Sequence, residues 1–299
     1  MTVRQEISDE SWAVLEPLFP VWKGNGRPIL DMRRTLEGIA WRFRTGAPWR
    51  DIPQRFGNWN SIYGRFSDWS KDGTWSRVLT TVQGASHRTG DLDWTVSVDS
   101  TITRVHQHGA SLPRDTGGPP SYKNLGAPEP ADHAIGKSRG GLTCKIHLAA
   151  DGKGRPLGLV LTAGHAADTM LFEAVLETIA VSTGNRGRPR TRPERVLADK
   201  AYTSKANRDY LTARGIKVTI PERADQKNNR VRRGAKGGRP RTFDRDAYKG
   251  RNVVERCFNR LKQWRGIATR SDKTARSYLA GVTFAAALIW IKSGLSNTP

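Results

Sequence analysis

The stretch YKGRNVVERCFNRLKQWR, residues 248–265, decides how the rest of the chain is interpreted. It contains no proline and a single glycine near its start, so it predicts one α-helix of about five turns. On a helical wheel, four polar residues share one stripe about 60° wide: Tyr248, Arg251, Glu255 and Lys262. The opposite face is expected to pack against a core, and it comprises Val253, Val254, Cys257, Leu261 and Trp264.

Glu255 is the residue of this stripe that needs an explanation. A lone glutamate among Arg251, Arg256 and Lys262 is most often part of a solvated salt bridge. A carboxylate displayed along a strongly basic helix is also typical of a metal ligand that meets polyphosphate. The rest of the chain is needed to decide between these two interpretations.

The composition indicates a polyanionic partner. Fifty Lys and Arg against 28 Asp and Glu give the 299 residues a net charge of +22, far beyond what solubility needs. Cys144 and Cys257 lack CxxC spacing, so neither a disulfide framework nor a zinc finger is predicted. The chain opens with charged residues rather than a signal peptide, and its longest apolar run, residues 282–291, is too short to span a bilayer. We therefore expect a cytoplasmic, nucleoid-associated protein.

The first quarter of the chain predicts a small all-α domain, residues 1–88. Seven of the ten tryptophans lie in it, and such large side chains stiffen a small core. Residues 32–44 predict one helix, and Asn58 or Asn60 is expected to cap another that ends near Lys71. This order is compatible with a helix-turn-helix that binds DNA, with a packing or dimerisation module as the alternative. The cations available to phosphates are Arg50, Arg55, Arg65 and Lys71.

From residue 92 the pattern changes to alternation, which predicts an α/β domain over residues 92–299. Val96 and Val98 share one face of the first strand, while Asp99 lies on the other face. A hairpin, a fourth strand that ends at Asp199 and a fifth strand follow, with helices between them.

Two segments interrupt this second domain. Residues 109–141 contain seven glycines and five prolines, which predicts a mobile loop. Residues 223–241 carry eight Lys or Arg and a single acid, Asp225, which predicts a flexible cationic arm.

Three acids stand at positions where they can converge. If the first and fourth strands are neighbours in the sheet, Asp99 and Asp199 lie side by side, and a helix packed across them brings Glu255 within reach. Hard cations prefer oxygen ligands, so this set predicts a Mg²⁺ or Mn²⁺ site. Two such ions can activate a water or a 3′-hydroxyl while they stabilise the leaving oxygen of a phosphodiester.

Four motifs then carry a resemblance to a known family. They are VDST at residues 98–101, GKSRGG at 136–141, ADKAY at 198–202 and the spaced set Tyr248-x2-Arg251-x3-Glu255-x6-Lys262. The chain resembles bacterial insertion-sequence transposases of the DDE class, in the insertion-sequence 4/5 group and of the insertion-sequence 5-like type. The resemblance covers nearly the whole chain, and the fourth motif is its most specific part.

This resemblance implies a fold, an activity and a set of residues. The fold is a ribonuclease H-like mixed five-stranded sheet with flanking helices, preceded by the helical domain. By this resemblance, Asp99, Asp199 and Glu255 are the catalytic triad and the ligands of two Mg²⁺ or Mn²⁺ ions. The partners are terminal inverted repeats and target DNA, bound by a homodimer on paired ends. A nuclease that cuts without joining, and a non-catalytic DNA-binding protein, are the alternatives.

The resemblance and the charge pattern together indicate which residues are candidates for binding DNA. Tyr248, Arg251 and Lys262 are linked by resemblance to handling of the second strand. Arg186 and Arg188, in a Gly-Arg-Pro context, are expected to enter an A·T-rich minor groove or to contact phosphates. The remaining candidates, from the cationic arm, are Arg232, Arg233 and Arg239.

Other polar residues have simpler interpretations. Asp168 could compete with Asp199 for the triad, but a helix cap is the better interpretation. Cys144 and His147 are expected to be packing residues rather than zinc ligands. His106 and His108 border the predicted loop and are expected to be solvated, with a DNA contact as the alternative.

Overall fold

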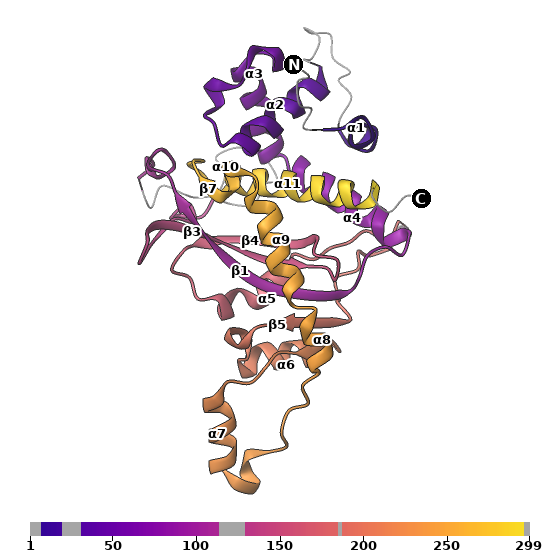
Figure 1. Cartoon of the computed structure of the whole chain (residues 1–299), viewed down its shortest axis with the longest axis vertical. Helices are drawn as coiled ribbons and strands as arrows, with labels where there is room; N and C mark the ends of the chain where they lie inside the picture. The colour runs from indigo at the N-terminus through magenta and orange to yellow at the C-terminus, as the bar shows by residue number, and fades with distance from the viewer. Residues whose placement is uncertain (1–6, 20–30, 114–128, 185–186, 296–299) are drawn as a thin grey trace.

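The computed structural model describes residues 7–19, 31–113, 129–184 and 187–295 of the chain. A mixed sheet stands at its centre, with a group of helices on one side and a projecting arm on the other (Figure 1). The strands are β1 (Thr95–Val105), β2 (Gly136–Ser138), β3 (Gly141–Ala150), β4 (Pro156–Ala163), β5 (Arg195–Ala198), β6 (Lys217–Thr219) and β7 (Thr269–Arg270).

Five strands cross the sheet in the order β4-β3-β1-β5-β6. β3 is antiparallel to β1 and to β4, whereas β5 runs parallel to β1 and β6 parallel to β5. The short strands fill the remaining edges, since β2 pairs with the start of β3 and β7 with the end of β1. This is the strand order of a ribonuclease H-like sheet, and the predicted fold class is confirmed.

Helices cover both faces of this sheet. Trp290 of α11 (Ala275–Leu295) donates its indole N–H to the carbonyl of Pro156 in β4, at 2.6 Å. On the other face of the same strand, a methyl group added to Gly158 would meet the carbonyl oxygen of Val175 in α5 (Phe172–Glu177) at 2.9 Å. Further helices are α6 (Lys205–Ala213), α7 (Ala224–Arg232), α8 (Arg245–Lys249), α9 (Asn252–Lys262) and α10 (Arg265–Ala268).

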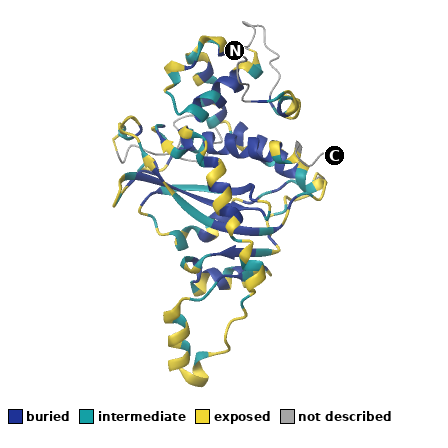
Figure 2. Cartoon of the chain, viewed as in Figure 1, coloured by how far each residue is buried: buried dark blue, intermediate teal, exposed yellow. Residues whose placement is uncertain are grey.

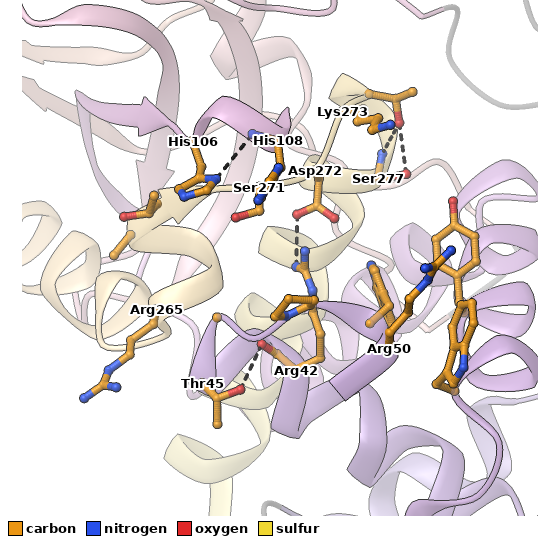
Figure 3. A pocket seen from close by; sticks show the side chains of 18 of the residues that line it. Arg42, Thr45, Arg50, His106, His108, Arg265, Ser271, Asp272, Lys273 and Ser277 are labelled. Carbon is orange, nitrogen blue, oxygen red and sulfur yellow. Dashed lines mark hydrogen bonds and ion pairs between the residues drawn. The ribbon is translucent and has the colours of Figure 1, made fainter. Parts of the chain in front are cut away.

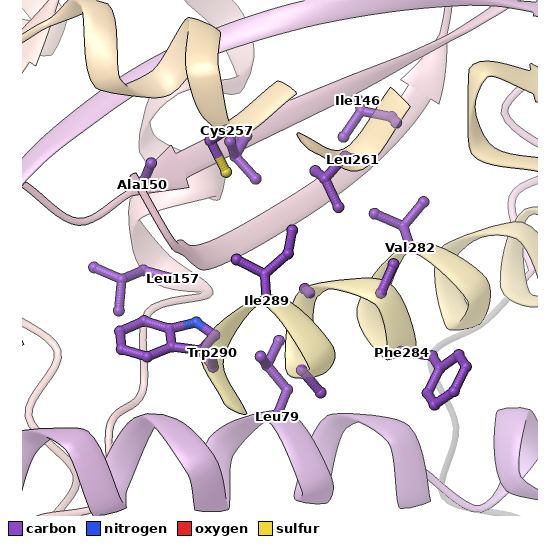
Figure 4. Close-up of a cluster of buried hydrophobic side chains, with 14 of the residues drawn as sticks. Leu79, Ile146, Ala150, Leu157, Cys257, Leu261, Val282, Phe284, Ile289 and Trp290 are labelled. Carbon is purple, nitrogen blue, oxygen red and sulfur yellow. The ribbon is translucent and has the colours of Figure 1, made fainter. Parts of the chain in front are cut away.

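α11 is the central core helix. By length and composition it could cross a membrane, but residues 282–291 are all buried inside the protein, as Figure 2 shows. It packs against α4 (Thr74–Arg88) on one side and against α9 and the sheet on the other (Figure 4). The apolar run is therefore a buried helix, as predicted.

The N-terminal helices are α1 (Asp9–Leu15), α2 (Met32–Thr45), α3 (Trp59–Lys71) and α4. α2 ends at Gly46, whose φ of 74° is costly for other residues. The Asn58 side chain accepts the N–H of Asn60 at 2.8 Å and caps α3, which ends at Lys71 as predicted. Rings of Phe19, Trp69 and Trp75 pack together in this region. The division of the chain into two domains near residue 88 stays a prediction.

Residues 248–265 do not form one continuous helix, so that prediction was wrong. α8 ends at Lys249 and α9 begins at Asn252, with Gly250 and Arg251 in a turn between them. Glycine favours such a break because its backbone loses more conformational freedom in a helix than any other residue. The apolar face is largely as expected: Val253, Val254, Cys257 and Leu261 are buried, and Trp264 is partly buried.

The two predicted flexible segments contain more regular structure than expected. The cationic arm, residues 223–241, includes α7 and a 3-10 helix at Gly234–Gly237, and it projects from the body as an exposed hairpin (Figures 1 and 2). Within residues 109–141, Glu129 is buried and accepts the N–H of Ala275 at 2.6 Å, and β2 joins the sheet. Residues 114–128 of that segment lie outside the described residues.

Candidate active site

Asp99 and Asp199 occupy equivalent positions on two neighbouring strands. Val98 of β1 pairs with Ala198, the last residue of β5, and each aspartate follows directly. Adjacent strands lie about 4.8 Å apart, so both carboxylates start from neighbouring backbone positions. Asp99 Oδ1 accepts the N–H of Ser100 at 2.8 Å, and Asp199 Oδ1 accepts the N–H of Ala201 at 2.7 Å. The predicted pairing of the first and fourth strands is confirmed.

Glu255 is connected to Asp99 through Arg251. The buried side chains of α9 fix the helix across β1 and β3, which leaves Glu255 half exposed with 51% of its side chain accessible. Arg251 Nη1 donates to Glu255 Oε1 and Arg251 Nη2 donates to Asp99 Oδ2, each at 2.7 Å. One guanidinium therefore bridges the acid of the strand and the acid of the helix.

The electrostatics of this bridge depend on partial burial. Burial raises the pKa of Asp99, and the N–H of Ser100 and the charge of Arg251 only partly oppose it. Burial also opposes the charge of Arg251, but Asp99 and Glu255 raise the pKa of its guanidinium above the usual value. Arg251 is thus a cation held between two acids, Asp99 and Glu255.

The donor set fits a hard divalent cation, although the observed arrangement is not a ready-made metal cluster. Asp99, Asp199 and Glu255 offer only oxygen ligands, which is the chemistry that Mg²⁺ and Mn²⁺ prefer. Among the described residues, no group of three or more acidic, histidine or cysteine side chains is close enough to hold an ion. At this site the acids are kept apart because the guanidinium of Arg251 lies between Asp99 and Glu255.

Tyr248 and Lys262 lie on either side of this bridge along the chain. Tyr248 belongs to α8, and its ring packs against Phe243 with a centroid distance of 5.1 Å. Lys262, at the end of α9, donates to Thr101 Oγ1 at 2.7 Å and to the carbonyl of Ile102 at 3.0 Å. Because of the break at Gly250, the four residues of the stripe do not stand on one helix. Lys262 instead ties the end of α9 to β1.

A second polar cluster, which the sequence did not predict, lies behind the aspartates. Asp168 Oδ1 accepts from Ser100 Oγ and from Lys145 Nζ, both at 2.8 Å. These bonds hold the pKa of Asp168 below its usual value although burial opposes this. Asp168 does not cap a helix through its side chain, so that interpretation was wrong. Since Ser100 follows Asp99, the cluster helps to fix the backbone at the candidate site.

The remaining candidates are dispersed. Arg232, Arg233 and Arg239 are exposed on the projecting arm, and Arg188 is exposed on another loop. Arg186 lies outside the described residues. Cys144 and His147 are buried packing residues, as expected, and His147 Nε2 lies 2.8 Å from Thr162 Oγ1. His106 and His108 are exposed beyond the end of β1.

Two family models match the chain. Residues 7–79 match a family described as "Putative transposase of IS4/5 family". Residues 91–290, which include the whole candidate site, match the family described as "Transposase DDE domain".

Individual relatives agree with these matches. A "Putative transposase for insertion sequence element IS6501" from Brucella ovis is 32% identical over 151 residues, 50% of this chain and 100% of that protein. A "Putative transposase for insertion sequence element IS402" from Burkholderia cepacia is 29% identical over 153 residues, 51% of this chain and 64% of that protein. Among solved structures, the "Mos1 transposase paired-end complex with left transposon end" aligns over 80% of each chain with 14% identity and a TM-score of 0.25.

Proposed function

The chain belongs to the DDE transposase family, and we propose that Asp99, Asp199 and Glu255 are the three carboxylates of its active site. Members of this family are enzymes that cleave DNA and transfer the cut strands with a divalent metal. For this chain we propose that the DNA is the terminal inverted repeat of an insertion sequence, and that the freed ends are joined to target DNA.

One observation supports this assignment above the others. Asp99 and Asp199 follow paired residues on parallel strands, and Arg251 connects Asp99 to Glu255 through two bonds of 2.7 Å. Acids from three distant parts of the sequence thus approach one place at the surface. A cluster of negative groups that needs an internal cation is well suited to bind a metal and a phosphodiester together.

The proposed chemistry is metal-dependent phosphodiester transfer. Two divalent ions, when bound by these acids, would lower the pKa of an attacking hydroxyl and stabilise the leaving oxygen. Water attacks the phosphorus at the element's end, and the bond to the 3′ oxygen breaks to give a free 3′-hydroxyl. That hydroxyl then attacks a phosphodiester of the target and releases a target 3′-hydroxyl. The number of phosphodiester bonds is conserved in this second step, so it needs no nucleotide cofactor.

Other side chains have proposed roles in holding the DNA. Arg251 can exchange its two carboxylate partners for the two oxygens of a phosphate, since a guanidinium binds both groups in a bidentate manner. Tyr248 and Lys262 lie before and after it, where they would contact flanking nucleotides. The basic residues of the arm and of residues 186–188 would contact phosphates further away. We also propose a homodimer on paired ends, acting in the cytoplasm.

The test uses DNA that carries the native ends of the element. The full chain is incubated with this DNA and Mg²⁺, and nicks and joined products are mapped at nucleotide resolution. We expect Asp99→Asn, Asp199→Asn and Glu255→Gln each to abolish cleavage while end binding stays nearly intact. Nicks without joined products would favour the nuclease alternative. Near-normal strand transfer by any one variant would remove that residue from the site.

A further inference from the structure

A large cleft lies between the N-terminal helices and the far end of β1 (Figure 3). Its volume is about 1230 Å³, above the roughly 300–1,000 Å³ typical of small-molecule pockets. Trp49, Arg50, Trp59 and Tyr63 line it from the N-terminal side. Residues from the end of β1 and from the segment between α9 and α11 line the opposite side. The cleft therefore has room for a ligand at least as large as a drug-sized molecule.

Aromatic rings form one wall of this cleft. Tyr63 of α3 is 40% exposed, so its ring is accessible from the cleft. Its ring stands edge-on to Trp49 with a centroid distance of 5.3 Å. Arg50 Cζ lies 5.5 Å from the ring centroid of Trp59. These partly exposed rings offer flat apolar surfaces on which a planar group can stack.

The charge of the lining is positive. Its single acid, Asp272, is already paired with Arg42 at 3.0 Å, and both side chains are only 3% exposed. Arg50, Arg265 and Lys273 also line the cleft, and they form no ion pair with any residue in the described parts of the chain. Their charges are therefore available to an anionic ligand.

We propose that this cleft binds a short single-stranded stretch of DNA, an inference that rests on the proposed function. A base stacks on Tyr63, while Arg50, Arg265 and Lys273 pair with the phosphates. Proteins that bind single strands combine aromatic platforms with a cationic groove in this way. A duplex keeps its base faces inside its own stack, so exposed rings serve unpaired bases instead.

The position of the cleft suits a single DNA strand whose end lies at the carboxylates of the candidate active site. β1 and its extension run seven residues from Asp99 to His106 at the cleft, a distance of about 23 Å at ~3.3 Å per residue. Lys262 lies along this route on Thr101, and Arg265, three residues further at the start of α10, lines the cleft itself. A strand whose end lies at Asp99 can follow these cations to the aromatic wall.

The test measures binding without chemistry. The full chain in EDTA, where metal-dependent cleavage cannot occur, is titrated with a short oligothymidylate that carries a central 2-aminopurine. We expect binding to quench the probe's fluorescence by stacking. Tyr63→Ala should weaken binding about fivefold or more and restore fluorescence, because one stacked base contributes about that much. Tyr63→Phe should bind and quench like the unchanged protein.

Arg50→Ala provides a second variant at an exposed residue, and Arg77→Ala is its matched control, because Arg77 on α4 has 63% of its side chain accessible and lies outside the cleft. We expect weaker binding from the first and nearly unchanged binding from the second. If folded Tyr63→Ala and Arg50→Ala bind and quench like the unchanged protein, the cleft proposal is overturned. If these variants bind normally and the unchanged protein still cleaves the element's ends with Mg²⁺, the cleft proposal fails and the proposed function stands. Tyr63-dependent binding without any cleavage of the element's ends would instead overturn the proposed function and leave a single-strand site.

Discussion

Arg251 Nη2 donates to Asp99 Oδ2 at 2.7 Å, so the chain places its own cation between acids proposed to hold a metal. The second nitrogen of the same guanidinium is bound to Glu255. A divalent ion shared by both acids competes with Arg251, because the guanidinium lies between them and repels a second cation. Phosphate is the natural new partner for the released guanidinium, so DNA binding and metal binding should support each other.

The first prediction concerns metal affinity in the absence of DNA. Arg251→Ala removes the competing cation, and charge-assisted hydrogen bonds contribute about 1.5–3 kcal/mol each. We therefore expect Mn²⁺ to bind about tenfold or more tightly to the variant, measured by isothermal titration calorimetry on the full chain. Arg256→Ala is the matched control, since Arg256 is exposed on the same helix. An equal gain in the control would attribute the effect to net charge, and a loss of affinity in Arg251→Ala would refute the competition.

A second prediction concerns the projecting arm. Arg232, Arg233 and Arg239 are exposed, and each phosphate contact releases counterions. Changing all three to Ala should weaken binding to the element's ends and make the slope of log K against log salt shallower by about 2 to 3. Replacement of the same three by Lys should keep most of the slope. A slope that does not change in the Ala variant would show that the arm does not touch DNA.

A third prediction concerns pH and His147. Burial lowers the pKa of His147 to about 4 from 6.5, and the nearby Asp168 only partly opposes this. Between these two values the unfolded chain binds a proton that the folded protein excludes. The contribution of neutral, buried His147 to the free energy of unfolding is therefore fully present above about pH 6.5. As the pH falls toward 4, the free energy of unfolding decreases by up to about 1.4 kcal/mol per pH unit.

Urea unfolding at several pH values checks this sign. His147→Gln should flatten the fall in the free energy of unfolding between about pH 6.5 and 5, where few carboxylates titrate. The difference between the two proteins is the quantity of interest, because other groups contribute equally to both. Parallel curves would mean that His147 does not carry the effect.

The fourth prediction concerns the buried pair Arg42–Asp272, which joins α2 to the segment before α11. Asp272→Ala leaves a buried guanidinium without its partner and should lower the free energy of unfolding by about 3–5 kcal/mol. Lys205 and Asp209 form a matched exposed pair, with 86% and 58% of their side chains accessible. Asp209→Ala should change stability by less than about 1 kcal/mol. Similar losses in both variants would contradict the role of burial.

Local signals made much of the fold predictable. Asn58 and Gly46 mark helix ends through bonds and backbone angles that involve only their near neighbours. The alternation around Val98 likewise reports a strand with one face in the core. The placement of Asp199 beside Asp99 could be predicted because each acid directly follows apolar residues of a predicted strand. Only the order of the strands in the sheet had to be assumed.

Contacts between distant segments limited the prediction of the site. Arg251 and Glu255 are spaced to meet on a helix, but the partner that fixes Arg251 is Asp99, 152 residues away. Asp168 precedes a helical segment, so a cap was the local interpretation. Its actual partners, Ser100 and Lys145, come from strands that no local pattern connects to it.

The burial of α11 also determines when the protein can fold. The ribosome makes this helix after every other described element, yet α4, α9 and the sheet all pack against it. Until α11 emerges, α4, α9 and β4 lack the packing surface that it provides. Joining α11 to α4 also closes a very long loop, at an entropic cost. Domains with such distant contacts fold slowly. α11 therefore completes the packing around α4 and α9 only after all three acids of the candidate site have been made.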